Sequence, residues 1–208
     1  KKVGIGMVTM RNAGHSGAIG HHALIAAKED MVGMCMTTGG LRVVPTFSSE
    51  PLLGTNPIAV AAPTNIKPTF LFDAATCSIA GNKVRLAQRN GKKLMPGWVS
   101  DKNGSPLMEE YKIEDDIDIP PLLPLGGTRE IGSHKGYGLS LVAEIMCSIM
   151  SGGIPSMLEG HEATNKHFFA AYNISAFTDL DEFKKKMDGM LTRLVNSKPA
   201  PEFQRVLY

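Results

Sequence analysis

Several features that would define a function class are missing from this sequence. No uninterrupted apolar run is long enough to cross a bilayer, and no basic block accompanies the near balance of 22 Lys and Arg against 20 Asp and Glu. We therefore expect neither a membrane nor a nucleic acid as a partner. Cysteine is also scarce, since only Cys35, Cys77 and Cys147 occur, widely spaced and in apolar surroundings. Buried, unpaired thiols indicate a reducing compartment, and we predict a cytoplasmic protein.

Two common signatures of binding sites are absent as well. The glycines between Gly14 and Gly20 do not have the G-x-G-x-x-G spacing of a Rossmann nucleotide site, and no acidic residue closes the following strand. Neither H-E-x-x-H nor paired C-x-x-C occurs, and His15 and His22 on one helix would stand about 10 Å apart along its axis. We therefore predict no metal site. Cys77 has no base beside it in the sequence, which disfavours a nucleophilic role.

The sequence does contain a series of short β-prone runs and helical patterns within 208 residues, a length that suits one domain or one with a small appendage. The predicted strands cover residues 3–10, 31–37, 58–62, 69–72 and 167–172. The predicted helices cover residues 18–28, 83–88, 133–150 and 178–196, the last capped by Thr178 with Asp181. Residues 90–133 carry much of the Pro and Gly, and such a long irregular stretch is usually functional or disordered.

The stretch Arg11-Asn-Ala-Gly-His15-Ser-Gly-Ala-Ile-Gly20 lies between the first predicted strand and the first predicted helix. His15 therefore occupies a strand-to-helix turn between two glycines, where side chains and free backbone N–H groups can face a ligand. A histidine in such a turn can give or take a proton near neutral pH. Taken alone, the segment also fits a turn histidine that is bonded to its local backbone.

Two further segments are candidates for ligand contacts. Asp73 follows an apolar strand and precedes Ala74 and Ala75, small residues that let a ligand approach the backbone while the carboxylate accepts a hydrogen bond from a hydroxyl group. A simple helix cap by Asp73 is the alternative. Lys135, followed by Gly136, stands in the first turn of a predicted helix, where a cation opposes the macrodipole. Lys135 is either a ligand for an anion or a solvated lysine.

Segments spread over most of the chain resemble one family, the NAD(P)-dependent malate/L-lactate dehydrogenases, which have no Rossmann fold. This family includes malate, L-sulfolactate, ureidoglycolate and diketogulonate oxidoreductases and the imine reductases of cyclic amino acids. The matching segments are Arg11-Asn-Ala-Gly-His15-Ser-Gly-Ala-Ile-Gly20, Leu53-Gly-Thr-Asn-Pro57, Phe72-Asp-Ala-Ala-Thr76, Gly97-Trp-Val-Ser-Asp101 and His134-Lys-Gly-Tyr-Gly-Leu139. Each segment is a weak signal alone, but together they occur in the family's order and are highly specific.

The resemblance implies an α+β fold, in which helices flank a predominantly antiparallel or mixed β-sheet that binds the cofactor. It implies that residues 1–208 form the NAD(P)-binding and catalytic region, that residues 38–170 hold the cofactor-binding portion of the sheet, and that an N-terminal helical segment is missing. His15 matches the catalytic histidine. The positions that match cofactor-binding segments are Thr38, Gly39, Thr55, Asn56, Asp73, Ala74, Ala75, Lys135 and Gly136. Thr38 stands where the family usually has an asparagine.

For function, the resemblance implies an oxidoreductase that uses NAD or NADP to interconvert a small 2-hydroxy acid, of malate or lactate type, and its 2-oxo acid. His15 would act as the general base for the hydroxyl proton in oxidation and as the general acid in reduction. The enzyme would be a homodimer with its active site at the subunit interface. Two alternatives stay open, namely a reductase of a cyclic imine acid and a catalytically inactive nucleotide-binding or scaffold homologue.

Overall fold

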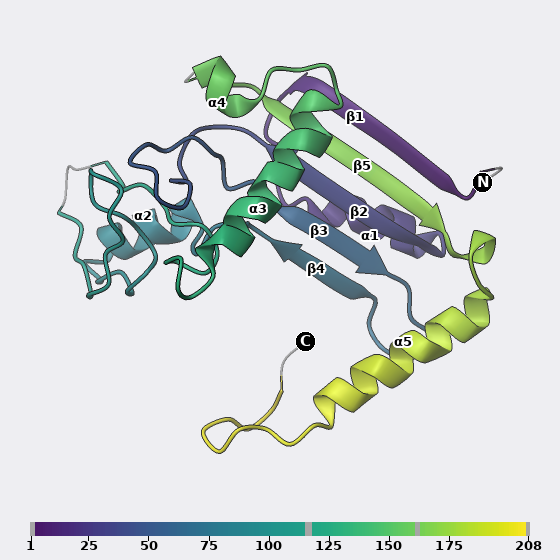
Figure 1. Ribbon diagram of the computed structural model, residues 1–208. Coiled ribbons are helices and arrows are strands. Elements are labelled where there is room, and N and C mark those ends of the chain that lie inside the picture. Colours follow the sequence, from purple (N-terminus) through teal and green to yellow (C-terminus); the bar gives the residue numbers. More distant parts are fainter. Residues whose placement is uncertain (1–2, 115–117, 161–162, 207–208) are drawn as a thin grey trace.

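The computed structural model describes residues 3–114, 118–160 and 163–206. Its centre is an antiparallel sheet with the strand order β1-β5-β2-β3-β4 (Figure 1). The strands are β1 (Ile5–Ala13), β2 (Met31–Thr38), β3 (Ile58–Ala62), β4 (Phe70–Ala74) and β5 (Asn165–Asn173). The helices are α1 (Gly20–Lys28), α2 (Gly81–Arg89), α3 (Ser133–Ala143), the π-helical η1 (Glu144–Ile149), α4 (Ser156–Glu159), the 3-10 turn η3 (Ile174–Ala176) and α5 (Leu180–Val195). The predicted α+β class with a largely antiparallel sheet is confirmed.

Helix α1 covers one face of the sheet, where it contacts β2 and β3. Its buried residues are all small, namely Gly20, Ala23, Ala26 and Ala27, so the helix backbone can approach the strands closely. The contact is tightest at Gly33 on β2, where a Cβ atom would lie 2.2 Å from the carbonyl oxygen of Ala23. A side chain at position 33 would therefore push α1 away from the sheet, and only glycine permits this close approach.

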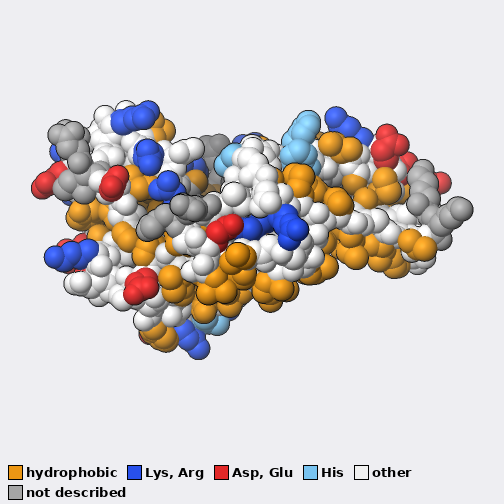
Figure 2. Space-filling view, turned by 90° about the horizontal axis from the view of Figure 1, so that it is seen from above, with side chains coloured by type: hydrophobic (Ala, Val, Ile, Leu, Met, Phe, Trp, Pro, Cys, Tyr) orange, Lys and Arg blue, Asp and Glu red, His pale blue; other side chains and the backbone are white. Residues whose placement is uncertain are grey.

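The opposite face of the sheet is covered by α3 and its continuation η1, which run diagonally across the strands (Figure 1). The sequence predicts one helix over residues 133–150, but the α-helix ends at Ala143 and a π-helical turn follows it. The core against the sheet consists of Met36, Ala143, Cys147, Phe168 and Ala170. The outward side is apolar too, with Leu139, Val142, Ile145, Ile149 and Met150 between 43% and 55% exposed. Figure 2 shows hydrophobic side chains gathered along this side of the molecule.

Loops and α2 form a lobe at one end of the sheet, with a hydrophobic core of their own (Figure 1). Single bridges join distant segments there, since Val43 pairs with both Leu53 and Leu122. The buried core of the lobe consists of Val43, Leu53, Cys77, Ile79, Val84, Leu94, Val99, Ile113 and Leu122. Trp98 packs against this core. The long irregular stretch of residues 90–133 is therefore, where the structure describes it, a packed part of the molecule.

Helix α5 lies apart from these layers, beside the turn between β3 and β4 (Figure 1). Its N-cap is Asp179, whose carboxylate accepts a 2.9 Å hydrogen bond from a backbone N–H in the first helical turn. The predicted cap by Thr178 with Asp181 is wrong, because it is Asp179 whose side chain accepts from that N–H group. Asp188 fixes the helix to the sheet by accepting two backbone N–H bonds from the β3–β4 turn. No helix in the described part of the chain is long and apolar enough to cross a membrane.

Candidate active site

A small cavity opens where the ends of β1 and β2 meet the starts of β3 and β5. These four strand ends lie at the same end of the sheet because the neighbouring strands are antiparallel. The cavity has a volume of about 80 Å³ and is lined by His15, Gly17, Thr37, Thr38, Gly39, Thr55, Asn56, Pro57 and Asn165. The fold therefore brings His15, Thr38, Gly39, Thr55 and Asn56 together from separate segments, whereas the other predicted site residues lie outside the cavity.

His15 is exposed and contributes one wall of the cavity. The backbone N–H of Gly17 donates a hydrogen bond to Nδ1 of His15 at 3.0 Å. Because an N–H group can only donate, Nδ1 carries no proton here, and the neutral ring has its proton on Nε2. The local backbone bond of the simpler interpretation therefore exists, but it occupies only one ring nitrogen. Nε2 stays available as a donor to a ligand.

A second histidine, which the sequence does not single out, supports the turn that carries His15. His167 on β5 is 2% exposed, and its Nε2 lies 3.1 Å from the carbonyl oxygen of Gly14 while its Nδ1 lies 2.7 Å from the Thr37 hydroxyl. A carbonyl oxygen only accepts, so Nε2 must carry a proton. Burial lowers the pKa of His167, against the opposing effect of the bond to Gly14. Its sequence signal is weak, a polar side chain at the start of the strand predicted over residues 167–172.

Close backbone contacts shape the floor of the cavity. A Cβ atom at Gly39 would lie 2.0 Å from Oδ1 of Asn165, and one at Gly54 would lie 2.4 Å from the carbonyl oxygen of Gly39. Asn56 has a positive φ of 36°, which is uncommon for a residue other than glycine. It is 1% exposed, and its Oδ1 has no hydrogen-bond partner among the described residues. A buried acceptor without a partner beside a cavity fits a bound group that carries a donor.

Asp73, Ala74 and Ala75 lie where β4 ends, alongside the start of β3. One carboxylate oxygen of Asp73 accepts a 2.8 Å hydrogen bond from the backbone N–H of Gly20, the first residue of α1. Asp73 thus does cap a helix, but it caps the helix that follows His15 rather than one that follows Asp73 itself. Within the described residues, its other oxygen has no hydrogen-bond partner, so this oxygen is available to a ligand hydroxyl.

Lys135 and Gly136 lie in the first turn of α3 and do not line the cavity. They are connected to it through the backbone. A Cβ atom at Gly136 would lie 2.5 Å from the backbone nitrogen and oxygen of Leu125. The N–H of Leu125 donates to the carbonyl oxygen of Thr76, and the N–H of Thr76 donates to the carbonyl oxygen of Thr55, each at 2.9 Å. This backbone path joins the exposed Lys135 to the cavity wall.

The size of the cavity limits what it can hold. Sites that enclose a whole ligand commonly measure about 300–1,000 Å³, whereas about 80 Å³ suits a single small group such as a carboxamide or a hydroxyl-bearing carbon. A ligand larger than such a group would have to extend beyond the cavity. Two larger hollows, of about 510 and 570 Å³, contain none of the predicted site residues. No cluster of three or more His, Cys, Asp or Glu side chains in the described ranges could hold a metal ion.

Known proteins resemble this chain over nearly its whole length. The sequence model described as malate/L-lactate dehydrogenase matches residues 1–208. The malate dehydrogenase of Pyrococcus abyssi is 43% identical over 99% of this chain and 57% of its own length. The L-sulfolactate dehydrogenase of Methanocaldococcus jannaschii is 35% identical over 98% of this chain and 58% of its own. The structure of malate dehydrogenase from Entamoeba histolytica matches with a TM-score of 0.86 at 34% identity, over 99% of this chain and 59% of that one. The chain spans less than two thirds of these relatives, and it belongs to the malate/L-lactate dehydrogenase family.

Proposed function

We propose that this chain is the cofactor-binding and catalytic region of an NAD(P)-dependent oxidoreductase. The reaction would interconvert a small 2-hydroxy acid, of malate or lactate type, and its 2-oxo acid. The observation that carries the proposal is the placement of His15, an exposed imidazole with one free nitrogen on the wall of a small polar cavity. Family membership and the malate dehydrogenases among the relatives support the substrate class.

In this proposal His15 moves the proton of the substrate oxygen. With the proton on Nε2, the ring can donate a hydrogen bond to a carbonyl oxygen and polarise it for reduction. To take up a proton from a hydroxyl group, the ring needs a nitrogen without a proton. That nitrogen is Nδ1, and its lone pair already accepts the hydrogen bond from the Gly17 N–H. The ring must therefore turn away from Gly17 as it takes up the proton, and its exposure permits that movement.

Bound NAD or NADP supplies the hydride acceptor for oxidation and the hydride donor for reduction. The residues proposed to hold it are Thr38, Gly39, Thr55 and Asn56 at the cavity, Asp73, Ala74 and Ala75 at the end of β4, and Lys135 and Gly136 on α3. The unpartnered oxygen of Asp73 suits a ribose hydroxyl, and the exposed ammonium of Lys135 suits a phosphate. The small residues between them leave the backbone open to close approach.

We also propose a cytoplasmic homodimer with its active site at the subunit interface. The apolar outward side of α3 and η1 supports a subunit contact there, since monomeric proteins rarely expose large contiguous apolar patches. A second subunit would also enlarge a cavity that is too small to enclose the ligand. Light scattering during size-exclusion chromatography of the full-length protein tests this. Wild type should elute as a dimer and Ile145→Lys as a monomer, and an unchanged mass would contradict this interface.

The function itself is tested on the full-length protein. Fluorescence titration with NADH and NADPH measures cofactor binding, and a panel of 2-oxo acids then measures turnover. Turnover of a malate- or lactate-type acid is the expected result. Turnover of a cyclic imine acid alone would favour an imine reductase. Cofactor binding without turnover of any of these acids would favour an inactive homologue.

The role of His15 is tested by His15→Asn in the full-length enzyme. Asparagine retains part of the hydrogen bonding but cannot exchange a proton near pH 7, so cofactor affinity should stay nearly intact while turnover falls by roughly 10²-fold or more. His21→Asn is a matched control, because His21 is exposed on α1 and does not line the cavity. Near wild-type turnover of His15→Asn would assign the proton transfer to another group.

A further inference from the structure

Glu144 is a buried carboxylate in a largely apolar stretch of helix. It is 2% exposed and lies where α3 passes into the π-helical turn η1. Ser140 and Ser148, four residues before and after it, are buried as well, so a polar stripe runs along the helix on its packed side. A buried carboxylate is costly unless donors surround it, and π-helical turns are frequent at functional sites. Both features indicate a functional role for this stripe.

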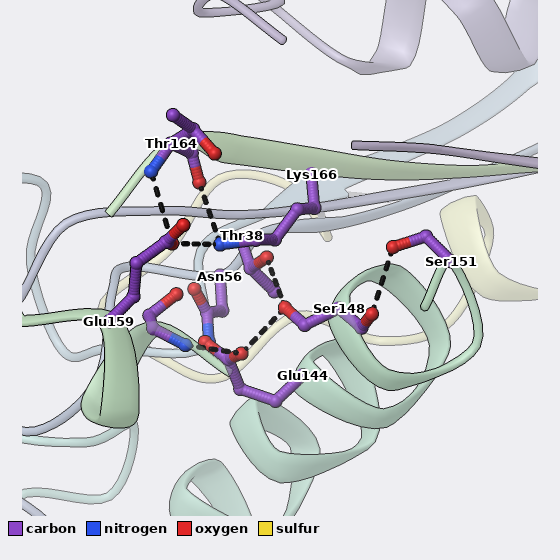
Figure 3. A network of polar contacts seen from close by, with 9 residues as sticks. Thr38, Asn56, Glu144, Ser148, Ser151, Glu159, Thr164 and Lys166 are labelled. Carbon is purple, nitrogen blue, oxygen red and sulfur yellow. Dashed lines mark hydrogen bonds and ion pairs between the residues drawn. The ribbon is translucent and has the colours of Figure 1, made fainter. Parts of the chain in front are cut away.

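Donors from three segments surround Glu144 (Figure 3). Nδ2 of Asn56 lies 3.3 Å from Oε1, the hydroxyl of Ser148 lies 2.8 Å from Oε2, and the backbone N–H of Ser156 lies 3.2 Å from Oε2. A carboxylate only accepts hydrogen bonds, so each of these partners must donate. Glu144 thus fixes the direction of the hydrogen bonds from Asn56, Ser148 and Ser156.

These directions extend to the wall of the cavity. Because Ser148 gives its proton to Glu144, it accepts from the hydroxyl of Thr38, which lies 3.0 Å away. Thr38 then has only lone pairs left to offer. Asn56 directs its NH2 group to Glu144 and to the hydroxyl oxygen of Ser140 at 3.0 Å, so that Oδ1 is left without a partner among the described residues. Thr38 and Asn56 both line the cavity.

We propose that Glu144 is a positioning residue that makes Thr38 and Asn56 present hydrogen-bond acceptors to the ligand. The inference rests on the proposed function and extends it by naming the kind of group that binds at Thr38 and Asn56, a hydrogen-bond donor. Two groups in the proposed reaction qualify, the carboxamide NH2 of nicotinamide and the hydroxyl of the 2-hydroxy acid. A substrate carboxylate would meet only lone pairs at Thr38 and Asn56, so it must bind away from these two residues.

Glu144→Gln tests the proposal because it reverses one of these directions. The Ser156 N–H can only donate, so the glutamine oxygen replaces Oε2 and the glutamine NH2 faces Asn56. The Asn56 amide must then turn over to accept, which places its own NH2 where the free acceptor stood. We expect the ligand to bind about tenfold more weakly, the scale of one reversed buried hydrogen bond. With Asn56→Asp added, one carboxylate oxygen accepts from the glutamine NH2 and the other offers an acceptor to the cavity. The double variant should therefore recover most of the affinity.

Fluorescence titration measures the dissociation constant of the cofactor for full-length wild type, single variant and double variant, and kinetics give KM for the 2-hydroxy acid. A cofactor analogue with a methyl group in place of the carboxamide NH2 distinguishes the two donors. Weaker binding of the natural cofactor, with unchanged binding of the analogue, places the carboxamide at the cavity. A raised KM with unchanged cofactor affinity places the substrate hydroxyl there.

Glu159→Gln is the matched control. It removes another carboxylate nearby, one that receives the ammonium of Lys166 and the backbone N–H of Thr164 but has no hydrogen bond to Thr38 or Asn56. This variant should unfold at a lower temperature and retain both constants. A positioning role thus predicts a change of affinity that general destabilisation does not produce.

The outcomes separate this inference from the proposed function. Wild type that binds neither NADH nor NADPH would overturn the proposed function. If wild type binds, the inference is overturned by unchanged affinity and KM in Glu144→Gln, or by equal losses in the single and double variants. If Glu144→Gln does not fold, Ser148→Ala tests the part that involves Thr38, because it frees the Thr38 proton to turn towards the cavity. Binding several-fold weaker is expected, and unchanged affinity would again overturn the inference.

Discussion

Replacement of His167 by phenylalanine removes both hydrogen bonds of a buried imidazole and keeps a flat ring of similar shape. The lost contacts are the 3.1 Å bond to the Gly14 carbonyl and the 2.7 Å bond with the Thr37 hydroxyl. Each such bond contributes about 1 kcal/mol net. The Thr37 hydroxyl can still donate to the Lys166 carbonyl at 3.2 Å. The Gly14 carbonyl is therefore the main group that loses its hydrogen-bond partner. We expect the free energy of unfolding to fall by about 1–2 kcal/mol near pH 7.5.

The loss of stability caused by His167→Phe should depend on pH. Burial lowers the pKa of His167 in the folded chain, whereas a histidine in the unfolded chain titrates near about 6.5. Between these values the unfolded chain binds more protons. The stability contributed by neutral His167 is therefore complete above about pH 6.5 and is lost as the pH falls towards the lowered pKa. Phenylalanine does not titrate, so the difference between wild type and variant should narrow at acidic pH.

Urea denaturation of the full-length proteins at about pH 7.5 and about pH 5.5 measures both effects. The other histidines are common to both proteins, so their titration largely cancels in the difference. A loss below about 0.5 kcal/mol near pH 7.5 would refute the two-bond assignment. An equal loss at both pH values would refute the view that His167 is held neutral by burial.

Three further predictions concern the cofactor path and the thiols. Lys135→Ala should weaken cofactor binding by roughly 1.5–3 kcal/mol, the scale of a charge-assisted hydrogen bond, whereas Lys83→Ala, the equivalent third residue of α2, should leave the dissociation constant unchanged. Ala74→Leu should block binding by steric overlap at the end of β4, and normal binding by a folded variant would place the dinucleotide elsewhere. Burial raises the pKa of all three thiols, to about 12 for Cys147, so mass spectrometry should find them unalkylated by iodoacetamide near pH 8 until urea is added.

Local sequence patterns predict most of the secondary structure but not all of its limits. Residues 58–62 are predicted as a strand between breakers, and β3 has these bounds. The strand predicted over residues 69–72 instead runs from Phe70 to Ala74, because pairing of Ala74 with Ile58 extends it beyond the apolar run. Such pairing depends on a partner strand that local composition does not reveal. The strand predicted over residues 3–10 is displaced in the same direction, with β1 at Ile5–Ala13.

The candidate site is predictable where short motifs carry it and not where the fold assembles it. His15 and Asn56 belong to recognisable segments, and both line the cavity. Asn165 also lines the cavity, but only because β5 pairs antiparallel with β1, which places its first residue beside the last residue of β1. The sequence does not single out Glu144, because one polar residue within an apolar run predicts an exposed position, nor His167, because it follows two polar residues at the start of a strand. The spacing of Glu144 four residues from a serine on either side is the sequence signal that could have located it.

The hydrogen bond from the Gly20 N–H to Asp73 affects how mutagenesis at this site should be designed. It connects the first turn of α1, directly after the His15 segment, to the end of β4. Asp73→Ala would therefore remove a helix cap, at a cost of about 1 kcal/mol, together with any contact to a ligand. A loss of activity in that variant would confound recognition of the cofactor with placement of His15. Asp73→Asn keeps an oxygen acceptor for Gly20 and removes the charge, so the contribution of the carboxylate to binding can be measured while the turn that carries His15 is still anchored.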